Sequence, residues 1–470
     1  MSPISNGFAA LADWLASTTF YAVNVGGVEI NLIVVWLATA MIFFTVRLGF
    51  LNVRAFPLAI RNLVQRRKEE GAAGELSHFE ALMTALSGTV GLGNIAGVSI
   101  AIAMGGPGAV VWMVLLGFFA MTLKCVEVTL GVKYRQIREN GQVSGGPMWT
   151  LRNGLAAHGR PRLGKILGGI YAGFCMFAFI QVIQVNQSYS QLSVVMGWEQ
   201  SQTTALVFGL VIAGLAALVL IGGVTVLASV TSRLVPLMCL IYVMGVVVVL
   251  ATHATLIPGA LWIILKDAVA PEAVAGGIFG AFVAGMRRAV FSNEAGVGTA
   301  SIVHALVKTD EPASEGIVAL LEPFIDTIVI CTCTALVVVV TGAYQGEHSD
   351  IAMTSAAFES VVSWFPSVLA VVVCLFAFST IITVGYYGLQ AWGYLVGFSP
   401  LKARLYLAFF CGALPIGSLV DVSTVIKFSD SFFFLLSVPN VIGLYIMSAD
   451  IRSECLGYVK RQRARLSSRS

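Results

Sequence analysis

The sequence is poor in charge. Asp, Glu, Lys and Arg make up 11% of its 470 residues, whereas soluble domains carry about 25%. Hydrophobic residues make up 57%, and the mean hydropathy is +0.88. A soluble fold of this length could not bury so much apolar surface. We therefore expect most of the chain to lie in a lipid bilayer.

Motifs for catalysis and metal binding are missing as well. The eight cysteines form no Cys-x-x-Cys pair, and the five histidines are dispersed, so neither a disulfide framework nor a zinc site is expected. His-Glu-x-x-His, Gly-x-Ser-x-Gly and acidic metal clusters do not occur, which speaks against an enzyme. No basic region precedes the first apolar segment, so we expect a retained span and not a signal peptide.

Long apolar segments recur along the chain. A transmembrane helix needs about 20 mostly apolar residues. We expect eleven spans, at residues 28–50, 78–104, 109–131, 165–188, 203–223, 233–253, 275–306, 316–342, 366–395, 401–420 and 427–447. The predicted fold class is therefore an all-α membrane protein.

The basic residues indicate how the spans are oriented. If the N-terminus is outside, inner loops and helix ends hold all 28 lysines and arginines except Lys266, Lys427, Arg287 and Arg288. The inner group includes Arg66, Arg67, Lys68 and Arg469. Such a bias predicts an external N-terminus and an internal C-terminus. The basic tail at 451–470 is then a cytoplasmic anchor, with lipid binding as the alternative.

Two of the predicted spans share an unusual glycine motif. Residues 87–94 read Ser-Gly-Thr-Val-Gly-Leu-Gly-Asn, and residues 292–299 read Ser-Asn-Glu-Ala-Gly-Val-Gly-Thr. Five spans separate the two starts, so the segments enter the membrane from opposite faces. This pattern predicts an inverted repeat of five plus five helices behind one extra helix. The expected domains are residues 1–77 (first span and connection), 78–256 (first repeat), 257–450 (second repeat) and 451–470 (tail).

Paired glycines favour unwinding of a helix, because glycine costs about 1 kcal/mol relative to alanine. Unwound backbone is tolerated in a membrane only where it lines a cavity or is buried in protein. Its free carbonyls can hold a cation, and a half-helix N-terminus can hold a carboxylate. The alternative is that the glycines only allow close helix packing. The occurrence of two matching segments favours a binding site.

These segments resemble the alanine or glycine:cation symporter family, whose members have the fold of the bacterial leucine transporter LeuT. The matching strings are residues 85–97, residues 291–298 (Phe-Ser-Asn-Glu-Ala-Gly-Val-Gly), residues 144–147, residues 321–327 and residues 376–380. The resemblance runs from about Asn52 to about Arg452. It implies sodium-coupled uptake of alanine, glycine or a related neutral amino acid across the cell membrane by alternating access, with Na⁺ as the coupling ion.

The resemblance also implies a set of binding residues. The substrate carboxylate is expected at the backbone of Thr89, Gly91 and Gly93, and Gln184 is expected to hydrogen-bond the substrate. The full substrate set is Thr89, Gly91, Gly93, Asn94, Gln184, Phe291, Ser292, Asn293, Gly296 and Val384. The implied sodium ligands are the carbonyls of Ser87, Val90 and Phe376 and the hydroxyls of Ser379 and Thr380. Neutral oxygens suit a hard cation such as Na⁺.

One departure and several charges leave alternatives open. The family often has Gly-Trp where this chain has Thr383-Val384, so we expect a larger pocket that accepts glutamine or serine as well as alanine. Glu294 either braces the unwound segment or takes a proton, which keeps proton coupling as an alternative. Arg287 and Arg288 either gate the outer side or pair with an acid. A channel is disfavoured, because channels usually form symmetric oligomers.

Two further positions inside predicted spans are expected to be structural. Lys124 and Glu127 are three residues apart on the third predicted span and can pair on one helix face. Asp326 in the eighth predicted span is expected to be a helix–helix contact.

Overall fold

The computed structural model describes residues 3–25, 28–64, 71–198, 201–269, 277–417 and 422–467. Some predictions fall outside these ranges. They concern the basic residues Arg66, Arg67, Lys68 and Arg469, and the ends of two predicted spans at residues 275–276 and 418–420.

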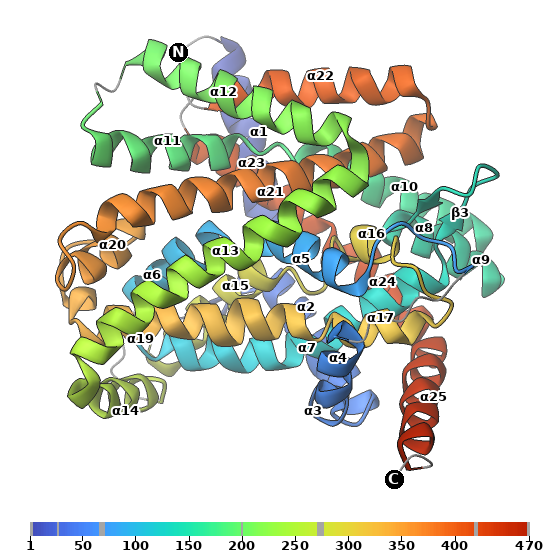
Figure 1. Ribbon diagram of the computed structural model, residues 1–470, viewed down its shortest axis with the longest axis horizontal. Coiled ribbons are helices and arrows are strands. Elements are labelled where there is room, and N and C mark those ends of the chain that lie inside the picture. Colours follow the sequence, from blue (N-terminus) through green and yellow to red (C-terminus); the bar gives the residue numbers. More distant parts are fainter. Residues whose placement is uncertain are drawn as a thin grey trace.

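Helices make up nearly all of the described chain, and most of the long ones run side by side (Figure 1). The longer helices are α1 Pro3–Thr19, α2 Leu32–Arg47, α4 Phe56–Val64, α5 His78–Thr89, α6 Leu92–Gly105, α7 Ala109–Lys133, α10 Pro161–Ala178, α11 Val182–Met196, α12 Gln202–Ile221, α13 Gly223–Thr252, α14 Ile257–Asp267, α15 Gly277–Asn293, α19 Thr332–Val340, α20 Ile351–Glu359, α21 Phe365–Val396, α22 Pro400–Gly417, α23 Val422–Leu435, α24 Ser437–Ile446 and α25 Ser448–Ser467. Shorter segments are α3 Leu51–Arg54, α8 Pro147–Trp149, α9 Leu155–Ala157, α16 Ser301–His304, α17 Pro312–Val318 and α18 Leu321–Pro323. Two small hairpins pair β1 Ala22–Val25 with β2 Val28–Asn31, and β3 Gln136–Ile137 with β4 Val143–Ser144.

The apolar helices confirm an all-helical membrane protein. Seven helices in the described ranges are long and apolar enough to cross a membrane, and the bent pair α5–α6 makes an eighth. The three other predicted spans correspond to helices of only 16, 17 and 18 residues, α2, α15 and α22, which are not among these eight. The number of spans that this structure supports is therefore seven or eight.

The N-terminal region differs from the prediction. The first span was expected to begin at residue 28, but residues 28–31 form β2, and helix α2 begins only at Leu32. Val23, Ile30 and their β-branched neighbours favour strand over helix, which explains the late start. The preceding helix α1, which the apolar pattern did not reveal, packs on α23, and Lys427 Nζ lies 2.8 Å from Asp13 Oδ1.

Two further spans contain irregular segments that their apolar pattern conceals. The predicted span 165–188 is divided, because α10 ends at Ala178 and α11 begins at Val182. Inside the predicted span 316–342, residues Phe324–Cys331 form a π-helical segment. Single π-helical turns inside α-helices are frequent at functional sites.

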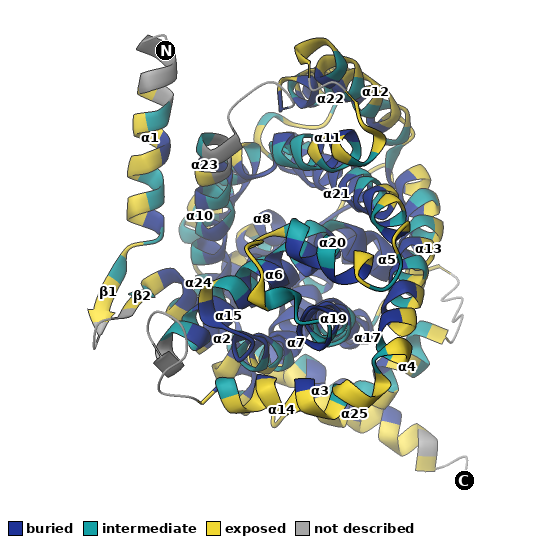
Figure 2. Cartoon of the chain, turned by 90° about the vertical axis from the view of Figure 1, so that its left-hand side faces the viewer, coloured by how far each residue is buried: buried dark blue, intermediate teal, exposed yellow. Residues whose placement is uncertain are grey.

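Burial places the two glycine motifs at the centre of the bundle. Helices α5, α6, α7 and α15 are mostly buried, whereas α12, α14, α22 and α25 carry exposed residues at the rim (Figure 2). Two hydrophobic clusters surround the motif helices, one including Phe376 and Leu123, the other including Tyr387 and Tyr171. Apolar side chains such as Leu218, Ile221 and Val46 are exposed on the outside, as expected of a lipid-facing surface.

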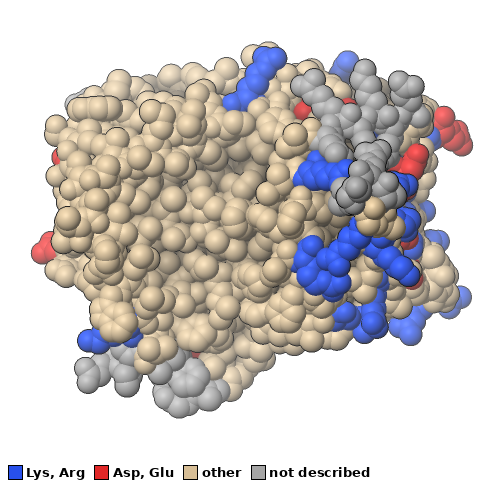
Figure 3. Space-filling model, turned by 60° about the horizontal axis from the view of Figure 1, so that its bottom comes forward, with Lys and Arg blue, Asp and Glu red and all other residues tan. Residues whose placement is uncertain are grey.

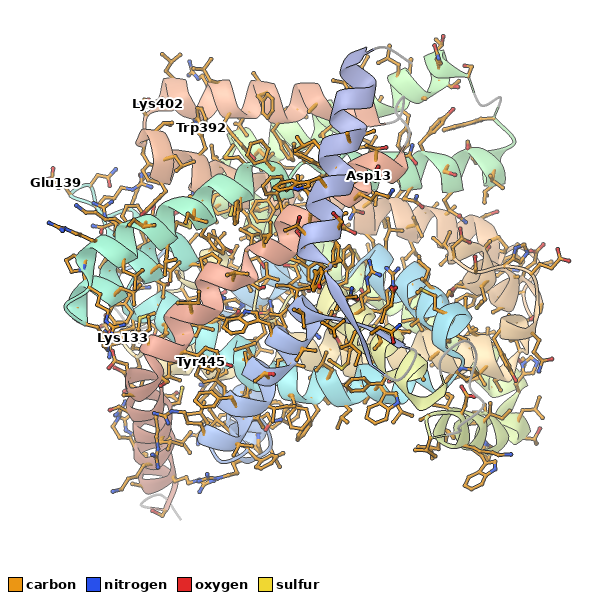
Figure 4. All side chains as sticks on the ribbon, turned by 180° about the vertical axis from the view of Figure 1, so that it is seen from behind. Asp13, Lys133, Glu139, Trp392, Lys402 and Tyr445 are labelled. Carbon is orange, nitrogen blue, oxygen red and sulfur yellow. The ribbon has the colours of Figure 1, made fainter. Side chains whose placement is uncertain are left out.

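Charge is concentrated at one end of the molecule. On the face shown in Figure 3, most lysine and arginine side chains gather at one end, and the middle of that face is uncharged. Lys133 and Glu139, which are close in the sequence, and Lys402, which is far from both, lie toward this end (Figure 4). The broad uncharged surface fits a protein that crosses a bilayer.

Candidate functional site

The first glycine motif breaks its helix within two residues. Helix α5 ends at Thr89, Val90 is extended (φ −72°, ψ 111°), and α6 begins at Leu92 with a bend of 43°. Gly91 has φ −172°, an extended conformation open to any residue, and its N–H donates to Asn94 Oδ1 at 2.7 Å. The predicted break is therefore present, and it is short.

The second motif breaks its helix over a longer stretch. Helix α15 ends at Asn293, and the next helical turn begins at Ser301. Glu294, Gly296 and Gly298 are left-handed, with φ of 53°, 93° and 89°. Glycine adopts such angles without strain, whereas a side chain rarely does. The second predicted break is also present.

Protein side chains satisfy the backbone of the second break. Glu127 Oε1 on α7 accepts from Gly296 N at 2.8 Å and from Asn440 Nδ2 at 2.8 Å. Asn440 Nδ2 also donates to Gly296 O at 2.9 Å, and Tyr171 Oη donates to Val297 O at 3.0 Å. Buried backbone groups need such partners in a membrane. This break is therefore a fixed structure.

A buried carboxylate joins the two breaks. Asp326, in the π-helical segment, accepts from Asn94 Nδ2 at 2.6 Å on one side and from Ser292 Oγ at 2.6 Å on the other. Thr327 Oγ1 donates to the same carboxylate at 2.8 Å. Sequence reasoning treated Asp326 as an ordinary helix contact, because nothing in the chain shows that the two motifs meet at this residue.

The first break faces helix α21 with neutral oxygens. Ser379 Oγ lies 3.3 Å from the carbonyl oxygen of Ser87 and 2.9 Å from that of Phe376. Thr380 Oγ1 lies 3.1 Å from each of the same two oxygens. The structure thus brings four of the five predicted sodium ligands together. The fifth, Val90, is extended at the end of α5, beside a glycine whose Cα faces Thr380.

A cavity of about 120 Å³ lies between the two breaks. That is room for several water molecules or one small solute. The residues that line it come from five elements and the α10–α11 junction: Gly88, Thr89, Gly91, Leu92, Gly93, Ala178, Phe179, Ile180, Gln181, Ile183, Gln184, Phe291, Glu294, Thr380, Val384, Ser429, Asp430 and Phe433. Aromatic rings form one wall, where Phe291 lies 5.9 Å from Phe433 between ring centroids.

Three buried polar atoms in this cavity wall have no hydrogen-bond partner among the described residues. They are Gln181 Oε1, Gln184 Oε1 and Ser429 Oγ. An unsatisfied buried polar atom costs about 1–3 kcal/mol, so its presence calls for a reason. Three such atoms around one cavity point to a polar ligand. The sequence indicated Gln184 but not Gln181 or Ser429, whose only signal was polarity inside an apolar run.

The predicted substrate residues fall into two groups. Thr89, Gly91, Gly93, Gln184, Phe291 and Val384 line the cavity. The other four bond to protein: Asn94 and Ser292 to Asp326, Asn293 to Thr327 and Ala295, and Gly296 to Glu127 and Asn440. In this structure the second group gives the breaks their shape.

The charged residues near the site have specific partners. Glu294 is buried and accepts from Thr299 Oγ1, so it braces the second break through a side chain and not through backbone amides. Lys124 was expected to pair with Glu127, but its ion pair is with Glu322 Oε2, at 3.3 Å. This expectation rested on spacing along one helix, and a carboxylate from another helix lies in a better position.

The two arginines of α15 differ from each other. The Arg287 guanidinium lies over the Phe20 ring, 4.9 Å from its centroid. Arg288 and Arg287 both act electrostatically on Asp430, which lines the cavity. Neither arginine lies within ion-pair distance of Glu294 in the described structure.

Comparisons with known sequences agree on one protein family. The sequence profile of the sodium:alanine symporter family matches residues 15–470. The chain is 36% identical over 418 residues to the sodium/alanine symporter AgcS of Methanococcus maripaludis, covering 88% of this chain and 91% of that protein. It is 32% identical over 445 residues to the probable sodium/glutamine symporter GlnT of Bacillus subtilis, covering 92% and 89%.

A solved structure shares the fold. The crystal structure of MhsT in complex with L-phenylalanine matches with a TM-score of 0.58 at 15% sequence identity, covering 82% of this chain and 93% of that chain. The architecture is thus of the LeuT type.

Proposed function

This chain belongs to the sodium:alanine symporter family, and we propose that it carries alanine or a related small neutral amino acid into the cell with Na⁺ through the cavity between its two broken helices. It is a multi-pass membrane transporter and not an enzyme. The family establishes sodium-coupled amino acid symport. The binding residues and the substrate are our proposal.

The observation that carries this proposal is the set of orphaned polar atoms around a cavity next to a helix start. Unpaired oxygens that can accept hydrogen bonds from an ammonium group are present on Gln181, Gln184 and Ser429. Leu92 and Gly93 line the cavity in the first turn of α6, where helix-terminal amides and the helix dipole favour a carboxylate. The Gly91 amide itself is bonded to Asn94. An amino acid carries both groups a short distance apart. Ring faces of Phe291 and Phe433 suit a small apolar side chain.

The oxygens at the first break fit Na⁺. Ser87 and Phe376 would contribute carbonyls, Ser379 and Thr380 would contribute hydroxyls, and Val90 would complete the set. When bound, Na⁺ supplies the positive charge that holds α5 and α21 together. Because the site adjoins the cavity through Thr380, each ligand raises the affinity for the other. The sodium gradient then drives uptake.

Alternating access follows from the proposed topology. We infer eleven spans with the N-terminus outside and the C-terminus inside, in repeats at 78–256 and 257–450, with 1–77 and 451–470 flanking them. A second hollow of about 640 Å³ lies toward the basic end and includes Tyr386 and Gln390 of α21. Val384 of the same helix lines the central cavity. Tyr387 lies between these positions along α21 and is buried, and we infer that it helps to close the inner side.

The first experiment measures uptake of labelled alanine into proteoliposomes under an inward Na⁺ gradient, with K⁺ replacing Na⁺ in the control. We expect uptake only with Na⁺. The Gln184→Ala variant should raise the KM for alanine by about tenfold, since it removes one substrate contact of about 1.4 kcal/mol. Asn186→Ala, one half-turn away and bonded to Gly417 O, is the matched control. Uptake that is equal in K⁺, or driven by pH alone and lost in Glu294→Gln, would overturn sodium coupling.

Val384 tests the size of the substrate. We propose that a valine at this wall leaves room for glutamine or serine beside alanine, because an indole at the same place would fill the space. Competition by unlabelled glutamine should inhibit alanine uptake by the natural protein. The Val384→Trp variant should lose that inhibition and keep alanine uptake. If glutamine does not compete with alanine in the natural protein, the enlarged pocket is refuted.

A further inference from the structure

A second cluster of ionisable groups lies apart from the central cavity. It contains His78 at the start of α5, His304 at the end of α16, Glu315 on α17, Glu322 on α18 and Lys124 on α7. None of the five lines the central cavity. Four of them are at most 1% exposed, and only the His78 side chain, at 14%, reaches the surface.

The five groups form one continuous chain of contacts. His78 Nδ1 contacts Glu315 Oε2, and Glu315 Oε1 contacts His304 Nδ1. On the other side of the ring, His304 Nε2 lies 2.6 Å from Glu322 Oε1. Glu322 Oε2 lies 3.3 Å from Lys124 Nζ. This series of side-chain contacts thus leads from the surface at His78 to Lys124 in the middle of α7.

The contacts of His304 fix a minimum number of protons. Both of its ring nitrogens face carboxylates, and a carboxylate without a proton only accepts. A neutral imidazole has one N–H, so it can satisfy only one of the two contacts. The second contact needs one more proton, and the ring takes it because an imidazole is more basic than a carboxylate. His304, Glu315 and Glu322 therefore share a proton beyond those of a neutral histidine and two ionised glutamates.

The charge balance of the surroundings points the same way. Near Lys124 lie Glu127, Glu294 and Asp326 in addition to Glu322. On the Glu315 side, further charged groups are Arg135, two residues beyond the end of α7, and the exposed Asp310. Carboxyls outnumber the permanently charged cations in this region. A buried charge without a partner costs several kcal/mol, so bound protons have to offset the excess.

We propose that His304, Glu315 and Glu322 form a proton-binding site, separate from the substrate and sodium sites, that exchanges its proton with the cytoplasmic side through His78. The ligand is H⁺ itself. The His78–Glu315 contact joins α5 to α17, and α5 is the half-helix that bends against α6 at the first break. At the other end, Lys124 lies one helical turn from Glu127, whose charge acts on it, and Glu127 holds the amide of Gly296 in the second break. The proton site therefore connects internal pH to both breaks.

The consequence for transport rests on the proposed sodium-coupled uptake. As internal pH rises, His304 and His78 lose protons, the carboxylates repel one another, and the contact between α5 and α17 weakens. We expect the uptake rate at fixed external pH to change by about threefold or more between an internal pH of about 6 and about 9. The His304→Gln variant should show no such dependence while remaining Na⁺-driven.

Proton occupancy can be measured without transport. In purified protein labelled with ¹⁵N-histidine, the signal missing in His304→Gln identifies His304. We expect both ring nitrogens to be protonated near pH about 7 and one to lose its proton at higher pH. A single neutral tautomer throughout that range overturns the proton site. If the signal titrates but no amino acid is taken up, the proposed function fails and the proton site stands.

Two more variants keep the uptake test decisive. His78→Gln changes the residue at the surface end of this series of contacts and should leave the fold intact. The dependence of uptake on internal pH should be reduced at least about threefold. His348→Gln, on an exposed loop, is the matched control and should behave as the natural protein. A pH response that is unchanged in both His304→Gln and His78→Gln would contradict the proposal.

Discussion

The two broken helices carry similar motifs and yet form different structures. The first break is two residues long, and its glycine is extended, with φ −172°. The second is seven residues long and contains three left-handed residues. Hydroxyls of α21 face the first, and a carboxylate with an amide hold the second.

The different partners of the two breaks indicate that the breaks have different roles. Neutral hydroxyls such as those of Ser379 and Thr380 can turn their oxygens toward a cation and turn back when it leaves. Glu127 and Asn440 bind backbone groups directly, and their removal leaves these groups unpaired. We infer that the first break binds and releases Na⁺, whereas the second is a permanent support for the cavity wall. Five substitutions test this, beginning with the largest expected effect and ending with the smallest.

The glycines give the sharpest contrast. Gly296→Ala should lower the free energy of unfolding by about 3 kcal/mol, because the new side chain is strained at φ 93° and collides with Leu37. Gly91→Ala should fold normally, since its methyl group would lie 3.4 Å from Thr380 Oγ1 in an extended backbone. It should instead lose Na⁺-dependent uptake. Thermal unfolding in detergent together with uptake distinguishes the two. Equal losses of stability would remove the contrast.

Thr380→Ala tests the sodium side. Removing one of the ligands should raise the Na⁺ concentration for half-maximal uptake about tenfold, or about 1.4 kcal/mol, with little loss of stability. Thr341→Ala is the control, because Thr341 Oγ1 bonds only within its own helix turn, to Val337 O at 2.8 Å and to Val338 O. An unchanged sodium dependence in Thr380→Ala would exclude it as a ligand.

Asn440→Ala tests the support side. It removes the hydrogen bonds to Glu127 and Gly296, and leaving these groups unpaired should cost about 2 kcal/mol of stability. The apparent affinity for alanine should fall, and the sodium concentration for half-maximal uptake should change much less. Thermal unfolding and uptake kinetics measure both. A change confined to sodium affinity would reverse the assignment of the two breaks.

The smallest effect is expected far from both breaks, at Asp450 on α25. Burial opposes its ionisation, but the Tyr134 hydroxyl and the Lys133 ammonium outweigh this and hold the pKa of Asp450 below its usual value. A carboxyl whose pKa is lowered by folding stabilises the folded protein at pH values above its pKa in the unfolded chain. This stabilisation is lost as the pH falls below about 4. Asp450→Asn should therefore cost at most about 1 kcal/mol near neutral pH. Limited proteolysis of α25 should detect it, with uptake unchanged.

The sequence predicted both breaks, and it named residues that the structure brings together. Both glycine motifs occur in helices that end within them, and four of the five predicted sodium ligands meet at one place. These features depend on local backbone preference and on motif, which are readable in the chain. The start of the first span was wrong, because β-branched residues formed a hairpin where apolar content alone indicated a helix.

Other parts of the site depend on residues brought together from distant segments. Gln181 and Ser429 line the cavity because α10 breaks at residue 179 and α23 packs beside it. Lys124 pairs with Glu322 and not with its helical neighbour. Polarity in an apolar run marks such residues as unusual but does not identify their partners.

The sequence by itself determined that the chain lies in a membrane, that two of its helices break at glycines, and that it belongs to the sodium:alanine symporter family. Hydropathy and backbone preference are properties of short segments, so they can be inferred directly from the sequence. Only the tertiary structure decided that Asp326 joins the two breaks and that His304 lies between two glutamates. Contacts between helices depend on how those helices are tilted and rotated against each other, and no single segment encodes that arrangement.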